Sequence, residues 1–287
     1  MKLLGKRAVI TGASQGLGLA IARVFLAEGA SVLICARNAA ELETARQELD
    51  AAHPGKVFAE RCDVGKAADV DGFAAAAARL LGGVDILVCN AGVQGPKGPI
   101  DNVDWDAWVQ AVQINLMGTV YCCRAFLPQL RESSRGKILV ISGGGATKPM
   151  PNLSAYAASK AGVVRFAETL AEELKAEGID VNSIAPGALN TRMLDEILEA
   201  GPDVVGEKYY QSAVKQRDSG GASPELGGKL CAYLASSAGD GITGRLISAQ
   251  WDPWERMESF KEEMRATDVY TLRRIIPAER GKTWEDV

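Results

Sequence analysis

Short apolar runs rich in β-branched residues alternate along the chain with longer segments in which apolar residues recur every three or four positions. The short runs predict β-strands, and because they are apolar at consecutive positions, both faces of their sheet should be covered. The longer segments have the spacing of amphipathic helices. Strands are expected at residues 7–11, 31–36, 56–62, 85–90, 137–142, 180–185 and 245–249.

Helices should separate these strands, most clearly at residues 17–28, 39–51, 104–130 and 155–177. This alternation, with right-handed crossovers, predicts a Rossmann-like α/β fold, a doubly wound parallel sheet with helices on both faces. Residues 188–222 break the alternation with polar sequence that contains Gly and Pro. Because this insertion follows the carboxyl end of a strand, we expect it to form a lid or a substrate loop.

Charge and composition exclude several classes of function. The formal net charge is -4, from 32 basic and 36 acidic residues, so no excess of positive charge favours a nucleic-acid partner. The apolar runs are too short for a membrane span and the first residues lack the features of a secretion signal, so we expect a cytoplasmic protein. The cysteines show no metal-binding spacing, and we interpret them as reduced, small apolar residues at Cys35, Cys62, Cys89, Cys122, Cys123 and Cys231.

A glycine-rich turn joins the first strand to the first helix, in the sequence TGASQGLG. Glycines there permit a tight turn, close approach of a diphosphate to the backbone, and close packing of helix on strand. The helix N-terminus adds unpaired N–H groups and a positive dipole end. The alternative is an ordinary tight connection, but the strand-turn-helix context favours a dinucleotide site made by Gly12, Ser14, Gln15, Gly16, Leu17 and Gly18.

The end of the second strand bears on the choice of cofactor. An acidic residue there would bind the ribose 2′-hydroxyl of NAD, but the sequence reads Cys-Ala-Arg-Asn and has no carboxylate. Arg37 is placed to meet a 2′-phosphate, which favours NADP(H) over NAD(H). The alternative is an exposed arginine without a role, and no second basic residue lies in the glycine loop to support Arg37.

Tyr156 and Lys160 are four residues apart on a predicted helix, so both side chains project from one face. A neighbouring ammonium lowers the pKa of a phenol, which would let Tyr156 exchange protons near pH 7. Taken alone the pair is weak evidence, because an aromatic ring and a lysine often share a surface helix.

Together with other motifs the pair resembles the short-chain dehydrogenase/reductase family. The motifs, in the family's order and spacing, are TGASQGLG, Asp63-Val64, Asn90-Ala91-Gly92, Asn115, the run Tyr156 to Lys160, and Pro186-Gly187. The similarity covers about residues 3–249. It implies a seven-stranded sheet, NAD(P) binding, and hydride transfer between nicotinamide and the carbon of a small alcohol or ketone.

The resemblance also implies a role for each matching residue. Tyr156 would be the general acid/base, Lys160 would hold the nicotinamide ribose and tune Tyr156, and Asn115 would support a water that links Lys160 to solvent. Asp63 would contact the adenine. The other implied cofactor contacts are Val64, Asn90, Ala91 and Gly92 on the adenosine side and Pro186, Gly187 and Thr191 at the nicotinamide.

One position departs from the family pattern. The family has a serine thirteen residues before the tyrosine, where it donates a hydrogen bond to the substrate oxygen, but this chain has Gly143 there. A shift of one residue would let Ser142 act, and otherwise a backbone N–H or another side chain must compensate. Removing such a donor typically costs about 10²–10³ in rate. Gly143 therefore keeps open a cofactor-using epimerase or dehydratase without net redox change. A non-catalytic NAD(P)-sensing protein is a third alternative, but the intact Tyr156, Lys160 and Asn115 argue against it.

The chain continues beyond the last predicted strand, so we expect a catalytic domain at residues 1–249 and a C-terminal extension at 250–287. The extension should contain a helix near 255–266 and pack on the core or on a neighbouring subunit. The predicted helices at 104–130 and 155–177 are apolar around much of their circumference, which favours a homodimer or homotetramer. His53, the single histidine, lies in a His-Pro-Gly turn and is expected to be neither a metal ligand nor a catalytic base.

Overall fold

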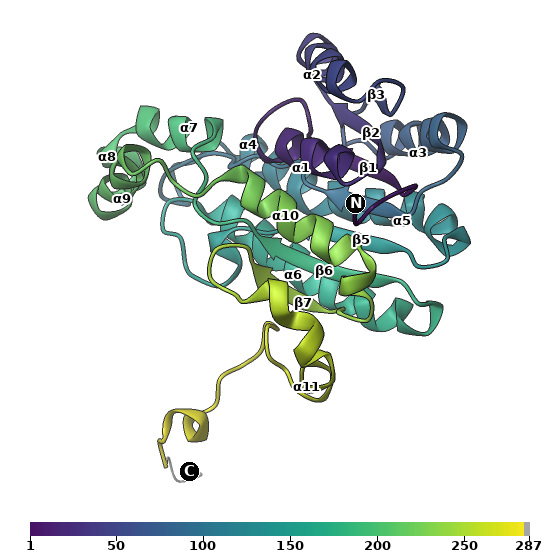
Figure 1. Cartoon of the computed structure of the whole chain (residues 1–287). Helices are drawn as coiled ribbons and strands as arrows, with labels where there is room; N and C mark the ends of the chain where they lie inside the picture. Colours follow the sequence, from purple (N-terminus) through teal and green to yellow (C-terminus); the bar gives the residue numbers. More distant parts are fainter. Residues whose placement is uncertain (284–287) are drawn as a thin grey trace.

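The computed structural model describes residues 1–283 and contains one parallel sheet with strand order β3-β2-β1-β4-β5-β6-β7 (Figure 1). From β1 the chain adds β2 and β3 on one side, and it then crosses back to place β4 to β7 on the other side of β1. The ends of β1 and β4 therefore form the crevice where ligands bind in such sheets. The strands are β1 (Arg7–Thr11), β2 (Ser31–Ala36), β3 (Val57–Arg61), β4 (Ile86–Cys89), β5 (Lys137–Ile141), β6 (Asp180–Ala185) and β7 (Arg245–Ser248).

Helices cover both faces of the sheet, and this confirms the predicted doubly wound fold. In Figure 1, α1 and α10 lie in front of the sheet and α4, α5 and α6 lie behind it. The long helical segment predicted at residues 104–130 is divided by a π-helical turn, Gln113–Met117. The helices of this part are α1 (Gly16–Ala27), α2 (Ala39–Ala52), α3 (Ala67–Leu81), α4 (Trp105–Val112), α5 (Gly118–Glu132), α6 (Ser154–Leu174) and α10 (Pro224–Ala235).

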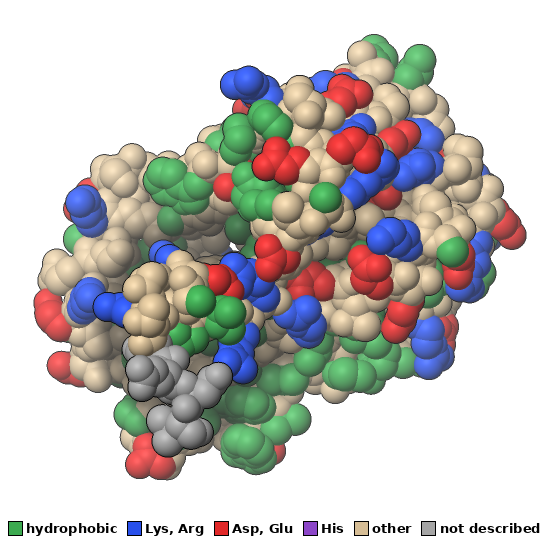
Figure 2. Space-filling model, turned by 90° about the horizontal axis from the view of Figure 1, so that it is seen from below, with side chains coloured by type: hydrophobic (Ala, Val, Ile, Leu, Met, Phe, Trp, Pro, Cys, Tyr) green, Lys and Arg blue, Asp and Glu red, His purple; other side chains and the backbone are tan. Residues whose placement is uncertain are grey.

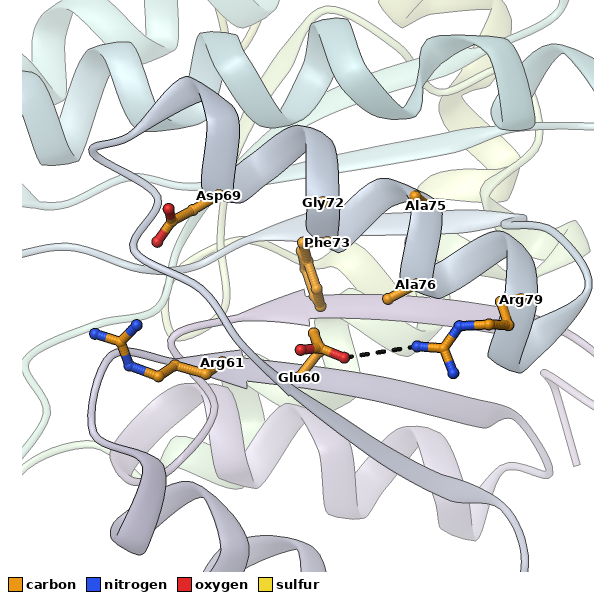
Figure 3. A pocket seen from close by; sticks show the side chains of 8 residues that line it. All are labelled: Glu60, Arg61, Asp69, Gly72, Phe73, Ala75, Ala76 and Arg79. Atoms are coloured by element: carbon orange, nitrogen blue, oxygen red, sulfur yellow. Dashed lines mark ion pairs between the residues drawn. The ribbon is translucent and has the colours of Figure 1, made fainter.

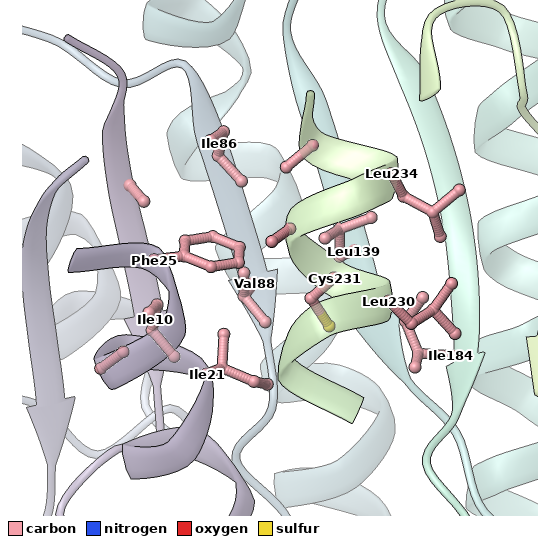
Figure 4. Packing of buried hydrophobic residues seen from close by; sticks show 14 of the residues in the cluster. Ile10, Ile21, Phe25, Ile86, Val88, Leu139, Ile184, Leu230, Cys231 and Leu234 are labelled. Atoms are coloured by element: carbon pink, nitrogen blue, oxygen red, sulfur yellow. The ribbon is translucent and has the colours of Figure 1, made fainter. Parts of the chain in front are cut away.

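The core has two layers because successive strand residues point to opposite faces. Val9 packs in the layer beneath α3, α5 and α6, whereas Ile10 packs in the layer beneath α1 and α10. Figure 4 shows the second layer, where side chains of α1 and α10 point toward the strands. The labelled members are Ile10, Ile21, Phe25, Ile86, Val88, Leu139, Ile184, Leu230, Cys231 and Leu234.

The insertion after β6 folds into a helical lobe that stands at the left of Figure 1. It comprises α7 (Arg192–Ala200), α8 (Pro202–Val205) and α9 (Glu207–Asp218). A bridge between Leu189 and Ala222 closes its base, where the Ala222 N–H donates to the Ala188 carbonyl at 2.7 Å. The lobe has a small apolar core of its own, so it is more ordered than the loop expected from the sequence.

The segment after β7 packs partly on the body and partly extends from it. A 3₁₀ helix, Trp254–Phe260, and α11 (Lys261–Ala266) bury Trp254, Met257 and Met264 in the core layer of α10. The Trp254 indole N–H donates to the Ala249 carbonyl at 3.0 Å. The chain then runs outward to a last 3₁₀ turn, Pro277–Arg280 (Figure 1), and residues 284–287 lie outside the described part.

The surface seen from below carries Lys, Arg, Asp and Glu side chains in a mixed arrangement (Figure 2). No helix within residues 1–283 combines the length and apolar character needed to cross a membrane. All six cysteines are buried, and each is a free thiol outside any disulfide bond of the described residues.

Candidate active site

A cleft of about 1390 Å³ opens at the carboxyl ends of the strands, between the glycine-rich turn and the helical lobe. It unites most residues that the sequence singles out, although they lie far apart in the chain. Those that line it are Gly12, Ser14, Gln15, Gly16, Leu17, Arg37, Val64, Asn90, Ala91, Gly92, Ser142, Tyr156, Lys160, Pro186, Gly187 and Thr191.

The glycine-rich turn is packed so closely that side chains are excluded from it. Gly12 has φ +65°, and a Cβ there would lie 2.7 Å from the Ala91 Cα. A Cβ at Gly18 would lie 2.5 Å from the Asn90 Nδ2, so Gly18 serves packing and does not line the cleft. Gln15 precedes α1 without a side-chain cap, which leaves the first-turn N–H groups directed at the cleft. This cradle fits the diphosphate of a dinucleotide.

Thr11 and Asn90 lock the turn to the end of β4. The Thr11 hydroxyl accepts the N–H groups of Asn90 and Ala91, both at 3.0 Å. The Asn90 carboxamide donates to the carbonyls of Thr11 and Gly12, both at 2.9 Å. Asn90 therefore holds the cradle in shape, and Thr11 shares a role that its place in a strand did not reveal.

Arg37 lies at the outer end of the cleft, and Arg61 contacts its backbone. Arg37 follows β2 and is exposed, and the Arg61 Nε donates to the Arg37 carbonyl at 3.1 Å because β2 and β3 pair in register there. Arg61 itself lines a second hollow between β3 and α3, where Figure 3 shows it directed away from the Glu60–Arg79 ion pair of 3.9 Å. Arg61 therefore holds the backbone at Arg37 and does not itself line the cleft.

Asp63 is used by its own turn. Its Oδ1 accepts the Gly65 N–H at 3.1 Å, and its N–H donates to Asp69 at 3.2 Å, while the neighbouring Cys62 and Val64 line the cleft. Asp63, which the resemblance places at the adenine, thus stabilises the turn whose neighbouring residues Cys62 and Val64 line the cleft.

Lys160 and Asn115 are buried polar residues at the cleft, and Lys160 lines it. The Lys160 ammonium donates to the Ile141 carbonyl at 2.9 Å. Asn115 accepts the Val93 N–H at 2.8 Å and donates to the Val93 carbonyl at 2.8 Å and to the Ser159 hydroxyl at 2.9 Å. Asn115 lies within the π-helical turn, a local widening that is frequent at functional sites. Asn115 fixes the backbone at Val93, in the segment that follows β4, and does not itself line the cleft.

Tyr156 lines the cleft beside the helical lobe, and its ring packs against the apolar core of that lobe. Burial raises the pKa of Tyr156 to about 12, and the nearby Tyr209 of α9 adds to the rise. From the sequence we expected Lys160 to lower the pKa of Tyr156, so this rise is opposite to that expectation. Burial also lowers the pKa of Lys160 to about 8, and its Nζ is 5.8 Å from the Tyr156 ring centre. The lysine therefore does not offset the loss of solvation at the phenol.

Gly143 lies directly against the tyrosine hydroxyl. A Cβ at Gly143 would overlap the Tyr156 hydroxyl oxygen and lie 3.1 Å from Cζ, so no side chain fits between them. The adjacent Ser142 is 3% exposed, and its hydroxyl has no hydrogen-bond partner among the residues described. The space that a side chain at position 143 would need is thus filled by the Tyr156 hydroxyl.

The wall of the cleft opposite the glycine-rich turn is formed by the segment after β6, the helical lobe and the segment after β7. A Cβ at Gly187, with φ +96°, would lie 3.0 Å from the Gln250 Oε1, and Thr191 lies opposite Gly16. Trp251 also lines the cleft while 78% exposed. Trp251 and Tyr209 are therefore cleft residues that no sequence motif indicated.

Comparison with known proteins gives concordant matches. Residues 6–201 match the family model for short chain dehydrogenase. The chain is 31% identical over 242 residues to 2-dehydro-3-deoxy-L-rhamnonate dehydrogenase (NAD(+)) of Sphingomonas sp. (strain SKA58), covering 84% of this chain and 95% of the relative. It is 37% identical over 253 residues to 3beta-hydroxysteroid dehydrogenase 1 of Eggerthella lenta, covering 85% and 92%.

A solved structure is similar over the same region. It is an NADPH-bound short chain oxidoreductase from Pseudomonas aeruginosa PAO1, described as containing an atypical catalytic center. The TM-score is 0.76 at 32% sequence identity, and the match covers 87% of this chain and 98% of that one.

Proposed function

Because the chain belongs to the short-chain dehydrogenase family and is an NAD(P)-dependent oxidoreductase, we propose that it interconverts a ketone and a secondary alcohol with Tyr156 as general acid/base. One observation carries this proposal: Tyr156 and Lys160 line the same cleft as the glycine-rich cradle. A bound nicotinamide would supply the hydride to the carbonyl carbon or accept it from the alcohol carbon.

The protonation state of Tyr156 favours the direction of carbonyl reduction. With a pKa of about 12 the phenol is protonated at pH 7, so Tyr156 can give a proton to the substrate oxygen as the carbon receives hydride. We assign the reprotonation of the phenolate to Lys160, whose pKa of about 8 makes its ammonium a ready proton donor. Lys160 would also hold the nicotinamide ribose, and Asn115 would position this group of residues.

The substrate oxygen needs a second donor, and we assign Ser142 to that role. The support is a buried hydroxyl without a hydrogen-bond partner in residues 1–283, on a residue that lines the cleft next to a glycine that touches Tyr156. Ser142→Ala should lower kcat by about 10²-fold if the hydroxyl acts on the oxygen in the transition state. An unchanged kcat would remove Ser142 and leave the role to a backbone N–H of the glycine run.

We propose NADP(H) as the preferred cofactor. Arg37 at the end of β2 lines the cleft and presents positive charge where a ribose 2′-phosphate would lie, and Arg61 from β3 holds the Arg37 backbone carbonyl. The glycine cradle, with Val64, Ala91 and Gly92, would hold the adenosine diphosphate, and Pro186, Gly187 and Thr191 would border the nicotinamide.

Two proposals concern the rest of the chain. Residues 1–249 would form the catalytic domain, and the extension after them would place Trp251 at the mouth of the cleft. Trp105 and Val109 of α4 are 60% and 45% exposed, and this apolar helix face supports self-association as a homodimer or homotetramer.

A screen of alcohols and ketones with both cofactors tests the proposed reaction. Net oxidation or reduction changes the absorbance of the reduced nicotinamide, and Tyr156→Phe should slow this change by about 10²–10⁴-fold while cofactor binding persists. An epimerase or dehydratase would form product without that change, and this outcome would contradict the proposal. Failure to bind either cofactor would contradict it more broadly.

A further inference from the structure

We propose that Gln94 binds a second oxygen of the substrate, on the carbon next to the one that reacts, and so selects hydroxylated alcohols and ketones. The inference rests on the proposed function, because it places the reacting carbon at Tyr156. It assigns a specificity-determining role to a residue outside the family motifs quoted above.

The chain path places Gln94 beside the reacting groups. A Cβ at Gly92 would lie 3.5 Å from the Lys160 Nζ, and a Cβ at Gly95 would lie 3.5 Å from the Cβ of Ala155, the neighbour of Tyr156. The segment from Gly92 to Gly95 therefore runs from the Lys160 ammonium to the first turn of α6, which carries Tyr156. Val93 packs into the core layer of α5 and α6, and its backbone is fixed by Asn115. Gln94, the next residue, lines the cleft.

The carboxamide of Gln94 lacks the partners that a buried amide normally has. The residue is 7% exposed, and its Oε1 accepts no hydrogen bond within the described part of the chain. Buried polar groups are nearly always paired, because an unpaired one costs free energy. Gln129, which is half-buried outside the cleft, also has an unpaired Oε1, but its Nε2 donates to the Ala74 carbonyl at 2.9 Å. An unpaired amide in a cleft is therefore an indication of a ligand group.

The surroundings define the chemistry of that ligand group. Apolar residues Met150, Ile197 and Tyr209 line the lobe side of the cleft. Lys97, three residues after Gln94, is paired with Glu196 at 3.4 Å, so its charge is already compensated. A neutral amide both donates and accepts, which suits a hydroxyl or carbonyl oxygen better than a carboxylate. The substrate thus carries a neutral oxygen beside the reacting carbon and an apolar remainder.

Matched alcohols test this assignment. Each pair differs by one hydroxyl on the neighbouring carbon: 1,2-cyclohexanediol and cyclohexanol, 2,3-butanediol and 2-butanol, 1-phenyl-1,2-ethanediol and 1-phenylethanol. Oxidation by the full chain with NADP⁺ or NAD⁺ gives kcat and KM for wild type, Gln94→Leu and Gln94→Asn. Leucine keeps the volume and removes the polar group, while asparagine keeps the group and shortens its reach. Binding of NADPH and the thermal midpoint are measured for every variant.

We expect wild type to prefer the diol in each pair that reacts. Gln94→Leu should lower kcat/KM for the diol about tenfold, mainly through KM, and change that for the mono-alcohol less than threefold. Gln94→Asn should fall between the two. Equal losses for both alcohols would show a structural role and overturn the proposal, as would a wild-type preference for mono-alcohols. If NADPH binds and mono-alcohols alone react, the proposed function stands and the role of Gln94 fails. If no alcohol or ketone reacts, both fail.

Discussion

Adding one methyl group at Gly143 should disable the enzyme while leaving its cofactor site intact. Gly143 has φ -168°, an extended conformation that alanine adopts without strain, so the backbone does not oppose the change. The added Cβ would overlap the Tyr156 hydroxyl oxygen, and Cζ and Cε1 would lie at 3.1 and 3.4 Å. The ring must therefore swing away from β5.

The size of the effect follows from this displacement. A normal contact between a carbon and the hydroxyl requires the oxygen to move by on the order of 1 Å, and a misplacement of that size costs about 10²-fold in rate. The crowding should also destabilise the fold by about 1–3 kcal/mol. We expect kcat for Gly143→Ala to fall about 10²-fold, with a Kd for NADPH within threefold of wild type.

Gly144→Ala is the matched control, because a Cβ at Gly144 would have no neighbour within 4 Å. Steady-state kinetics on one reacting alcohol or ketone, NADPH fluorescence titration and urea unfolding are measured for both variants. Gly144→Ala should resemble wild type in all three. Full activity in Gly143→Ala would refute the reasoning, because it would show that Tyr156 does not act from the position described.

Three further predictions concern charge and packing. The pKa of Lys160 is about 8 in the folded protein against 10.5 when exposed, so between pH 8 and 10.5 the unfolded state binds more protons and stability rises with pH. In urea titrations across that range, the unfolding free energy of wild type should rise by about 3 kcal/mol relative to that of Lys160→Met. A difference between the two proteins that stays constant with pH would contradict the lowered pKa of Lys160. Arg37→Gln should weaken NADPH binding by about 10–100-fold and leave NADH binding unchanged in fluorescence titrations, whereas equal losses would argue against contact with a 2′-phosphate. Trp254→Ala should lower the unfolding free energy by about 3–5 kcal/mol, because Trp254 is 5% exposed. Trp251 is 78% exposed, so Trp251→Ala should change the unfolding free energy by no more than about 0.5 kcal/mol. Similar unfolding midpoints for the two variants would contradict this placement.

The strands were predicted closely because buried parallel strands carry a local signal. All seven lie within a residue of their predicted ends, as in β3 (Val57–Arg61) against the expected 56–62. The helical lobe was less visible, since α7, α8 and α9 are short and bury only a small core of their own. Their order depends on packing against Met150 and Tyr156, which lie far away in sequence.

Motifs indicated which residues meet in the cleft but not what each one does there. The pKa of Tyr156 illustrates this, because a four-residue spacing to Lys160 predicts attraction and says nothing of burial. Arg61 and Gln94 belong to no quoted motif, and only the register of β2 with β3 and the path between Gly92 and Gly95 reveal them. Such roles arise from contacts between distant segments.

The most direct test of the central claim follows the hydride and the proton together. NADPH deuterated at the transferable position of C4 is mixed with a ketone that the wild-type enzyme reduces, and the product is analysed by mass spectrometry for wild type and Tyr156→Phe. We predict one deuterium on the carbinol carbon for each cofactor oxidised, and a rate about 10²–10⁴-fold lower for Tyr156→Phe with NADPH still bound. A product without deuterium from the cofactor, or an undiminished rate in Tyr156→Phe, would contradict hydride transfer assisted by Tyr156.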